Sequence, residues 1–213
     1  MVAMKTYIFD YNGTILNDAG HAAEIENIML EERGLPYGYT LEDYRSMFDT
    51  DMIHYYRQIG YTFETETFED VAKQFNALYR QRFPLMELCE GVLPLLQKIQ
   101  ENHDQAVILS SCQDAMLKEQ CEELGIASMF REIMGIDNFL AGSKVDIAKH
   151  WMIRSAVHPD ECVYFGDTLA DYSTAKAIGV ENIILVASGH QSYTRLAQVC
   201  PSVIHSLKEY KVL

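Results

Sequence analysis

The chain has 213 residues, a length typical of one domain or of one domain that carries an insertion. Hydrophobic residues make up 48% of it and charged residues 23%, as in a globular protein with a buried core. No run approaches the ~20 apolar residues that a transmembrane helix needs, which excludes that class of membrane protein. The apolar run near the N-terminus ends at Asp10 and is too short for a signal peptide, so we expect a cytoplasmic location.

The chain is strongly acidic, with 17 Lys and Arg against 31 Asp and Glu, a formal net charge of −14 and a pI of about 4.8. Such a surface repels nucleic acids and anionic lipids, so the sequence predicts neither a nucleic-acid nor a membrane partner. An anionic ligand would have to be held by a local site. The charge pattern predicts no particular oligomeric state.

The cysteines do not form a recognisable pattern. There are five of them, an odd number, scattered through the chain without a CxxC pair: Cys89, Cys112, Cys121, Cys162 and Cys200. Disulfide frameworks and zinc sites need paired or closely spaced cysteines. We therefore expect reduced thiols.

In chain order, short apolar runs alternate with amphipathic segments. The apolar runs predict strands over residues 5–10, 105–110, 132–136, 162–166 and 182–187. Amphipathic spacing predicts helices over residues 93–100, 115–123, 144–158 and 173–178. The runs lack polar alternation, which indicates strands buried on both faces, and the helices between them indicate a mostly parallel sheet.

The first connection differs from the others. Between residues 17 and 83 the pattern is helical, with helices expected over 22–32, 41–48, 52–59 and 68–83. This stretch is far too long for a simple crossover between strands. We predict an α/β fold in which residues 1–15 and 86–213 form a Rossmann-like parallel-sheet core and residues 16–85 form a helical cap inserted after the first strand.

Polar residues are concentrated where the predicted strands end. In an open parallel sheet, ligands bind beyond the carboxyl ends of the strands, so residues there belong to one rim. Those that follow a strand or lie near the third crossover are Asp10, Asn12, Gly13, Thr14, Ser110, Ser111, Lys144, Asp167 and Asp171. Three carboxylates, a lysine and hydroxyls thus converge from four segments.

This combination favours phosphoryl chemistry. Clustered carboxylates suit Mg²⁺, which takes one or two carboxylates together with phosphate oxygens. A lysine and a serine hydroxyl at the same rim would bind the other phosphoryl oxygens and neutralise their charge. An aspartate in this position can attack phosphorus to form an aspartyl-phosphate. The sequence therefore predicts a magnesium-dependent site for phosphoryl transfer.

Four motifs, FDYNGTIL, ILSS, the lone Lys144 and FGDTLAD, in this order and spacing, resemble the haloacid dehalogenase (HAD) superfamily of phosphohydrolases. The resemblance covers nearly the whole chain, and residues 185–192 (LVASGHQS) are similar to the phosphoglycolate-phosphatase-like branch. One motif alone occurs often by chance, but four in order at strand ends are specific. The resemblance implies hydrolysis of phosphoglycolate or another short anionic phosphate ester.

The resemblance also implies roles for individual residues. Asp10 would be the nucleophile and a Mg²⁺ ligand, and the backbone carbonyl of Asn12 would be a second ligand. Asp167 would bind the metal directly, and Asp171 would bind it through water or orient its shell. Gly13 would shape the loop beneath the nucleophile.

Phosphate recognition follows from the same resemblance. Ser110 would donate a hydrogen bond to the phosphoryl group, and Lys144 would hold both nucleophile and phosphate by its charge. The catalytic set would comprise Asp10, Asn12, Ser110 and Lys144. The phosphate-binding set would comprise Asp10, Asn12, Gly13, Thr14, Ser110, Ser111 and Lys144.

One position departs from the family pattern. Phosphatases of this superfamily usually carry Asp two residues after the nucleophile, as acid for the leaving alcohol and base for water, whereas this chain has Asn12. An amide forms hydrogen bonds but transfers no proton at neutral pH. General acid–base catalysis is worth about 10²–10⁴-fold, so we expect slow hydrolysis of simple alkyl phosphates unless another group substitutes. We expect Asn12→Asp to raise the rate.

Asn12 keeps other functions open. One is a catalytically impaired or non-catalytic phosphate-binding protein. Another is a phosphonatase or phosphomutase of the same fold. A mutase depends on the same acid–base position, which argues against it, and a phosphonatase uses a cap lysine, of which Lys73 is the only one here.

Several residues have alternative interpretations. Asp171 could instead cap the following helix, and Lys149 is an alternative to Lys144. His190 is as consistent with a surface loop as with the site, and Cys112 is interpreted as structural. In the predicted cap, an aromatic stripe is interpreted as core: Tyr44, Phe48, Tyr55 and Tyr56. Three cations are interpreted as solvated charges, one of which could meet a substrate carboxylate: Arg45, His54 and Arg57.

Overall fold

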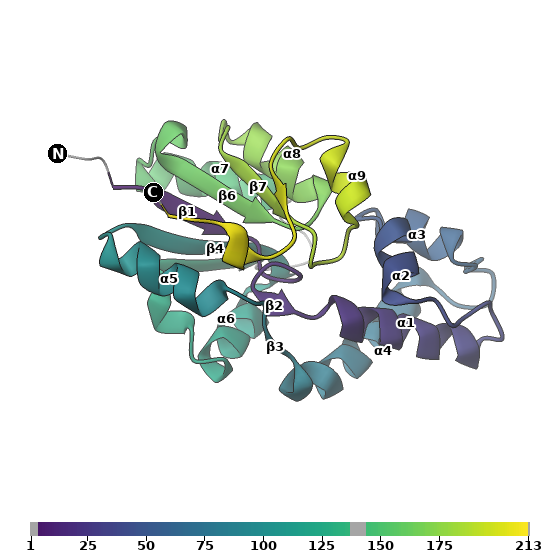
Figure 1. The fold of residues 1–213 in the computed structure, drawn as a ribbon. Coiled ribbons are helices and arrows are strands. Elements are labelled where there is room, and N and C mark those ends of the chain that lie inside the picture. Colours follow the sequence, from purple (N-terminus) through teal and green to yellow (C-terminus); the bar gives the residue numbers. More distant parts are fainter. Residues whose placement is uncertain (1–3, 137–143, 213) are drawn as a thin grey trace.

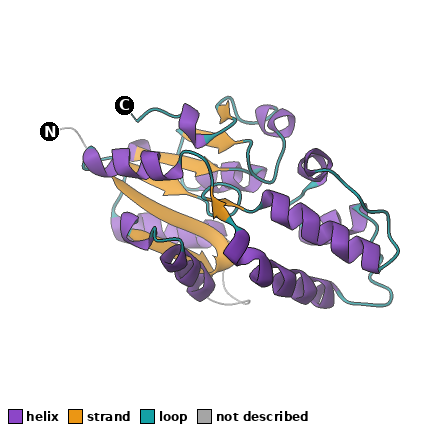
Figure 2. Cartoon of the chain, turned by 60° about the horizontal axis from the view of Figure 1, so that its bottom comes forward, coloured by secondary structure: helices purple, strands orange, loops and turns teal. Residues whose placement is uncertain are grey.

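The fold is a parallel β-sheet with helices on both faces and a further group of helices at one end (Figures 1 and 2). The computed structural model describes residues 4–136 and 144–212. The six-stranded sheet has the order β5-β4-β1-β6-β7-β8, and every neighbouring pair of strands is parallel. The predicted α/β fold with a Rossmann-like parallel sheet is confirmed.

All five predicted strands are present in this sheet. Its strands are β1 (Thr6–Phe9), β4 (Gln105–Gln113), β5 (Glu132–Ile136), β6 (Cys162–Gly166), β7 (Ile183–Val186) and β8 (Val203–Ile204). β4 continues past the predicted end at 110, because Gln113 pairs again with Ile136 after an irregularity that begins at Leu109. The prediction missed β8, whose two half-buried residues give too short an apolar run.

Helices connect most of the strands, and all but the last of these helices were predicted. They are α5 (Val92–Glu101), α6 (Asp114–Glu123), α7 (Lys144–Ser155), α8 (Leu169–Ala177) and α9 (Tyr193–Ala197), with 3-10 turns η1 (Phe83–Leu85), η2 (Ala127–Met129), η3 (Pro159–Glu161) and η4 (Leu207–Glu209). α8 begins before the predicted residue 173 because Thr168 and Asp171 form a capping box. α7 ends before 158, where Ala156 takes a left-handed φ of 54°.

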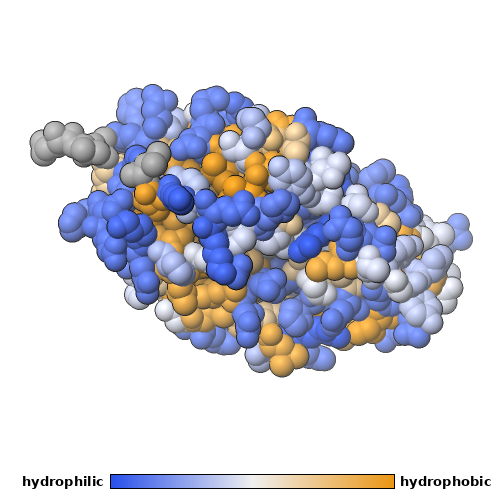
Figure 3. All heavy atoms as spheres, viewed as in Figure 1, coloured by the Kyte–Doolittle hydropathy of each residue, from blue (hydrophilic) through white to orange (hydrophobic). Residues whose placement is uncertain are grey.

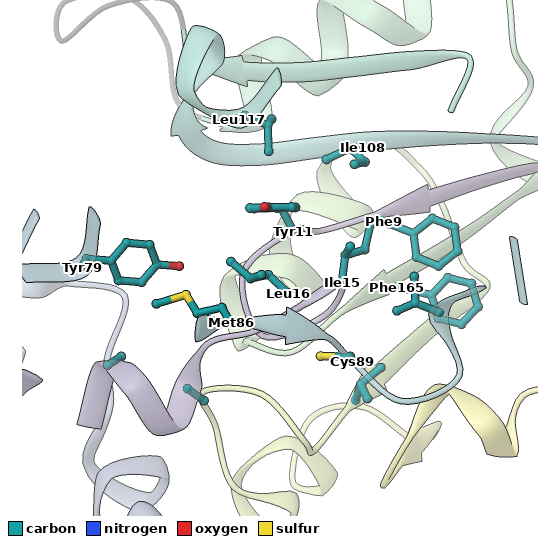
Figure 4. Close-up of a cluster of buried hydrophobic side chains, with 14 of the residues drawn as sticks. Phe9, Tyr11, Ile15, Leu16, Tyr79, Met86, Cys89, Ile108, Leu117 and Phe165 are labelled. Carbon is teal, nitrogen blue, oxygen red and sulfur yellow. The ribbon is translucent and has the colours of Figure 1, made fainter. Parts of the chain in front are cut away.

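β1 shows why the strands are apolar along their whole length. Tyr7 and Phe9 pack in the core cluster that includes α5, whereas Ile8 packs in a second cluster with α7 and α8. The Phe9 ring stacks on Phe165 of β6, with ring centroids 4.8 Å apart (Figure 4). Both faces of the sheet are therefore buried, as expected for parallel strands.

The helices at the end of the molecule form one continuous stretch of chain, residues 19–82, which we call the helical segment. It comprises α1 (Ala19–Glu32), α2 (Leu41–Met47), α3 (Met52–Gln58) and α4 (Phe68–Arg82). The chain leaves and re-enters the sheet region through a two-stranded antiparallel ribbon of β2 (Leu16–Asn17) and β3 (Glu87–Leu88), which the sequence did not predict. The division into a core (1–15 and 86–213) and a cap (16–85) stays a prediction, and residues 1–3, 137–143 and 213 lie outside the described part.

Local signals set the helix ends in this segment. Thr40 and Asp43 form a capping box at the start of α2, and Thr67 and Asp70 form another at the start of α4. α1 ends at Gly34, whose φ of +64° favours glycine. The starts predicted for α2 and α4, residues 41 and 68, agree with the structure, although the sequence analysis did not use the capping boxes.

The surface is mostly polar. Hydrophilic residues dominate the face shown in Figure 3, and apolar residues appear between them as patches. Within residues 4–136 and 144–212, no helix is long and apolar enough to cross a bilayer.

One carboxyl group is buried inside the helical segment, away from the sheet. Glu26 of α1 is 4% exposed, and its Oε2 has no hydrogen-bond partner among the described residues. Its neighbours include the buried tyrosines Tyr55, Tyr56 and Tyr61. Burial raises the pKa of Glu26 to about 8, because the charged form is poorly solvated there.

This burial makes the stability of the fold depend on pH. Between pH 4.5 and about 8 the folded state holds the Glu26 proton and the unfolded state does not, so this contribution is complete below pH 4.5 and is lost as the pH rises to about 8. Glu26→Gln removes the titration. We expect its free energy of unfolding, relative to the parent chain, to increase by about 2–4 kcal/mol between pH 5 and pH 8.

Urea unfolding at the two pH values measures this change. Glu31→Gln, an exposed position of the same helix, is the matched control and should show no such increase. Equal responses of the two variants would contradict the assignment.

Candidate active site

The loop after β1 is a tight turn that places Asp10 at the end of the strand. The Tyr11 carbonyl accepts from the amides of Ile15 and Leu16 at 2.8 and 2.9 Å, and the Gly13 amide donates to the Leu16 carbonyl at 2.9 Å. Gly13 has a φ of +73°, and a Cβ there would overlap the Asp167 carboxylate. The turn therefore requires glycine at this position.

Three of the predicted carboxylates lie together. Carboxylate oxygens of Asp10, Asp167 and Asp171 are all within 4.8 Å of one another, and all three residues are buried. The cluster forms because β1 pairs with β6 in the register Phe9 to Phe165, so both strands end side by side. Such a group of oxygen donors suits a hard divalent cation.

Lys144, the first residue of α7, supplies the counter-charge. Its Nζ forms ion pairs with Asp10 Oδ1 and, at 2.5 Å, with Asp171 Oδ1. Burial lowers the pKa of Lys144, but the two carboxylates outweigh it and hold the pKa well above the usual lysine value. Lys149 is exposed, which favours Lys144 for the lysine role.

Asp171 caps α8, which is one of its two predicted alternatives, and its metal-binding role stays a prediction. Its Oδ2 accepts from the Thr168 amide at 3.1 Å and from the Thr168 hydroxyl at 2.6 Å, so it caps α8. Its Oδ1 faces Lys144. One carboxylate therefore fixes the helix and takes part in the cluster.

The three carboxylates of the cluster carry more negative charge than Lys144 balances. Burial, with the charges of Asp171 and Asp167, raises the pKa of Asp10, and Lys144 opposes the rise. Burial, with the Asp171 charge, raises the pKa of Asp167 to about 7. A divalent cation among them would lower both pKa values, so the donor set fits the metal that the sequence predicts.

The predicted phosphate-binding residues divide into two groups. Ser110 and Ser111 line the cavity beside Asp10, and Ser110 Oγ accepts from the Cys112 amide at 3.0 Å. Thr14 is fully buried and its hydroxyl donates to Asp167 Oδ1 at 3.4 Å, so it supports the carboxylate cluster from beneath. Gly13 is also outside the cavity wall, under Asp167.

A cavity of about 420 Å³ adjoins the cluster. Its floor contains Asp10, Asn12, Ser110, Ser111, Lys144, Asp167 and Asp171, and the helical segment contributes much of its wall. The structure thus brings together, at one rim, residues from the ends of β1, β4 and β6 and from the start of α7. This is the geometry expected for a ligand site at the carboxyl ends of parallel strands.

A family model for haloacid dehalogenase-like hydrolases matches residues 7–185. The chain belongs to this family. No curated protein sequence matches it.

Solved structures share the fold of this family member over nearly its whole length. A haloacid dehalogenase-like hydrolase from Streptococcus pneumoniae aligns with a TM-score of 0.80 at 16% identity, covering 98% of this chain and 97% of that one. A predicted phosphoglycolate phosphatase from Haemophilus somnus aligns with a TM-score of 0.74 at 14% identity, covering 98% of this chain and 97% of that one. A predicted phosphatase from Clostridium acetobutylicum aligns with a TM-score of 0.72 at 20% identity, covering 97% of this chain and 96% of that one. At these identities the likeness shows the fold alone.

Asn12, the departure from the family pattern, is held by a residue that the sequence analysis missed. Asp18, at the start of α1, is buried, and its Oδ2 accepts from Asn12 Nδ2 at 2.8 Å and from the Tyr79 hydroxyl at 2.6 Å. Asn12 Nδ2 also donates to the Tyr79 oxygen at 2.8 Å. Figure 4 shows Tyr79 directing its hydroxyl toward the loop after β1. Because an ionised carboxylate only accepts hydrogen bonds, the NH₂ of the Asn12 side chain, and not its oxygen, must face Asp18.

His190, left open by the sequence, belongs to the same cluster. Its Nε2 lies 3.2 Å from Asp18 Oδ1, its Nδ1 lies 2.8 Å from the Tyr44 hydroxyl, and its amide donates to Asp167 Oδ2 at 2.6 Å. Burial lowers the pKa of His190, but the Asp18 carboxylate outweighs it and raises the pKa to about 9. Burial alone would raise the pKa of Asp18, yet the His190 charge and the donated hydrogen bonds lower it.

Asp18 was missed because an aspartate ahead of a helix resembles an ordinary N-cap, yet it makes no side-chain cap bond to α1. Besides Asn12, its side-chain partners come from α4 and from the loop after β7, which no local pattern connects to it. For His190, the only signal was the likeness of residues 185–192 to the phosphatase branch.

One interpretation of the helical segment needs correction. Arg45 is not a solvated charge: its guanidinium donates to the carbonyls of Ser188, at 2.5 Å, and Gly189, at 2.8 Å, and so ties α2 to the loop after β7.

The aromatic stripe is core, as expected, because Tyr44, Tyr55 and Tyr56 are buried in one apolar cluster and Phe48 packs against it. Tyr44 and Phe48 also line the cavity.

The cysteine prediction agrees with the structure. All five cysteines are free, and four of them are buried. Burial raises the pKa of Cys112 to about 12, so this thiol beside Ser111 stays protonated at neutral pH and is a poor nucleophile.

The contact between Asn12 and Asp18 changes what Asn12→Asp should do. The new carboxylate would lie against Asp18 in a buried cluster, so we expect it to lower the free energy of unfolding by about 2–4 kcal/mol. Asp18→Asn in the same chain restores one donor facing one carboxylate. The double variant should therefore be more stable than the sum of the single changes, by about 1–3 kcal/mol.

Denaturant unfolding of the four proteins at neutral pH measures this coupling. Asn17→Asp makes the same chemical change at an exposed neighbouring position and should leave stability nearly unchanged. Additive effects of the two substitutions would contradict the contact.

Proposed function

We propose that the chain is a phosphatase that hydrolyses a small organic phosphate monoester through an aspartyl-phosphate on Asp10. The supporting observation is the position of Asp10, buried among Asp167, Asp171 and Lys144 at the floor of a cavity large enough for a small metabolite. Phosphoglycolate is the reference substrate, because the sequence resemblance names it and a structural neighbour is described as a predicted phosphoglycolate phosphatase.

Magnesium is the cofactor that this donor set fits best. The carboxylates of Asp10 and Asp167 and the backbone carbonyl of Asn12 would hold it, with Asp171 directly or through water. When bound, Mg²⁺ supplies positive charge to the phosphoryl oxygens. Three buried carboxylates with one lysine between two of them carry a net negative charge that such a cation balances.

The side chains divide the reaction between them. Lys144 favours the ionised form of Asp10, which its buried surroundings oppose. Asp10 attacks phosphorus, the P–O bond to the leaving group breaks, and the leaving oxygen takes the electron pair. Ser110 donates a hydrogen bond to the phosphoryl group. Water then attacks phosphorus, the bond to Asp10 breaks and the carboxylate is regenerated.

The helical segment would serve as a cap. Tyr44, Phe48, Phe75 and Tyr79 of this segment line the cavity, so they can exclude water and select the substrate. The free cysteines are consistent with the proposed cytoplasmic location.

A second candidate is a phosphate-binding protein without turnover, favoured by the fixed amide of Asn12. A phosphonatase is less well supported, because the side chain of Lys73 is exposed and is not part of the described cavity wall. The same amide argues against a mutase.

Phosphate release from phosphoglycolate and other small esters, with and without Mg²⁺, tests the proposal. We expect Mg²⁺-dependent turnover that Asp10→Asn lowers by at least about 10³-fold, because the attacking oxygen is lost. Asp160→Asn, an exposed position, is the matched control.

Turnover that survives Asp10→Asn would contradict the role of Asp10. Phosphate binding without turnover by the parent chain would favour the binding protein instead.

A further inference from the structure

The cavity has two chemically different parts. Its floor holds the charged residues, whereas its wall, built by α1, α4 and α6 and by the chain from α2 into α3, is largely apolar. The apolar lining residues are Ala22, Tyr44, Phe48, Met52, Phe75, Tyr79 and Met116. Thr50 and Asn76 add neutral polar groups, and the charged lining residues Asp18 and His190 lie against each other. A phosphoryl group on the floor would direct its leaving group toward this wall.

In the described part of the chain, the wall offers no unpaired cation to a second negative charge. Among the described residues that line the cavity, only Lys144 and His190 are cationic. Lys144 is paired with Asp10 and Asp171, and His190 lies against Asp18. A carboxylate on the leaving group would lose its water against apolar side chains without gaining a cation, which is strongly unfavourable.

Arg45 does not change this balance. Its guanidinium donates to the Ser188 and Gly189 carbonyls, and it is not part of the described cavity wall. The remaining candidates from the sequence, His54 and Arg57, are exposed and likewise absent from that wall.

A separate observation concerns the proton that a leaving oxygen needs. Asn12 holds the position of the usual acid, and both hydrogens of its amide are donated to Asp18 and Tyr79. The Tyr79 hydroxyl itself donates to Asp18. The two cations of the described lining, Lys144 and His190, are held by carboxylates and are not directed at a leaving oxygen. We therefore expect the leaving group to depart as an anion, which is easy for a phenol, with a pKa of about 10, and difficult for an alkyl alcohol.

Both observations point to the same chemistry. We propose that this site selects aryl phosphate esters, in which the aryl group is aromatic, carries no charge of its own in the ester and can depart as an aryloxide without first gaining a proton. This inference rests on the proposed phosphatase function and narrows its substrate class away from phosphoglycolate. Asp10 bonds to phosphorus as the P–O(aryl) bond breaks, the aryloxide leaves with the electron pair, and it takes a proton from solvent after release.

Four esters test separately the two requirements on the leaving group, an acidic leaving oxygen and the lack of a second negative charge. Phenyl and benzyl phosphate both have apolar aromatic groups but differ in the acidity of the leaving oxygen. Ethyl phosphate and phosphoglycolate are similar in size but differ in the carboxylate. We expect kcat/KM for phenyl phosphate to exceed that for benzyl phosphate by at least about 10²-fold, the value of the missing acid. The kcat/KM for ethyl phosphate should exceed that for phosphoglycolate by about 10-fold or more.

The variant that carries both Asn12→Asp and Asp18→Asn is the internal control. It supplies a carboxyl group at position 12 without creating a pair of buried carboxylates, so the ratio of phenyl to benzyl phosphate should fall. Phosphoglycolate as the best substrate, or equal rates for phenyl and benzyl phosphate, would overturn the inference.

Ligand binding keeps the test independent of turnover. If no ester is hydrolysed, the proposed function fails, and calorimetry with Mg²⁺ present still compares phenylphosphonate with phosphonoacetate. Tighter binding of phenylphosphonate supports the aryl preference of the cavity. Tighter binding of phosphonoacetate, or no binding of phenylphosphonate, overturns it.

Discussion

The mutual repulsion of three buried carboxylates is the constraint on which this structure depends. Asp10, Asp167 and Asp171 come within 4.8 Å of one another, and only Lys144 pairs directly with two of them among the described residues. Such a cluster is tolerated only when other groups offset its charge. Thr14 and the His190 amide donate to Asp167 and Thr168 donates to Asp171, so the turn after β1, the start of α8 and the loop after β7 are all tied to the cluster.

A second carboxylate, Asp18, connects the helical segment to this cluster. It binds Asn12 from the loop after β1, Tyr79 from α4 and His190 from the loop after β7. Arg45 and Tyr44 of α2 reach the same loop. The segment therefore meets the sheet region through a few directed polar bonds as well as through apolar packing, and the cavity lies where those bonds converge.

The features that could be predicted from the sequence are those that a local pattern of residues determines. Buried strands were visible as apolar runs, and Asp10 and Asp167 followed from their positions at strand ends. Asp18 lies only six residues from its partner Asn12, but the partners that complete its cluster lie 61 residues away in α4 and 172 residues away at His190, so its role could not be predicted. The same holds for β8, whose two residues are recognisable as a strand only beside β7. In the sequence, Arg45 was indistinguishable from a solvated charge on a helix surface. Only the tertiary fold brought carbonyl groups within reach of its guanidinium.

The two glycines that flank Asp167 have a consequence for how such a protein can vary. A Cβ at Gly13 or at Gly189 would overlap the Asp167 carboxylate, although the two loops are far apart in the chain. The space for this carboxylate is thus defined by missing side chains on both sides. Even the smallest gain of bulk, a single methyl group on either loop, would displace it, so the two loops are joint targets for inactivating change in a protein whose exposed surface can drift freely.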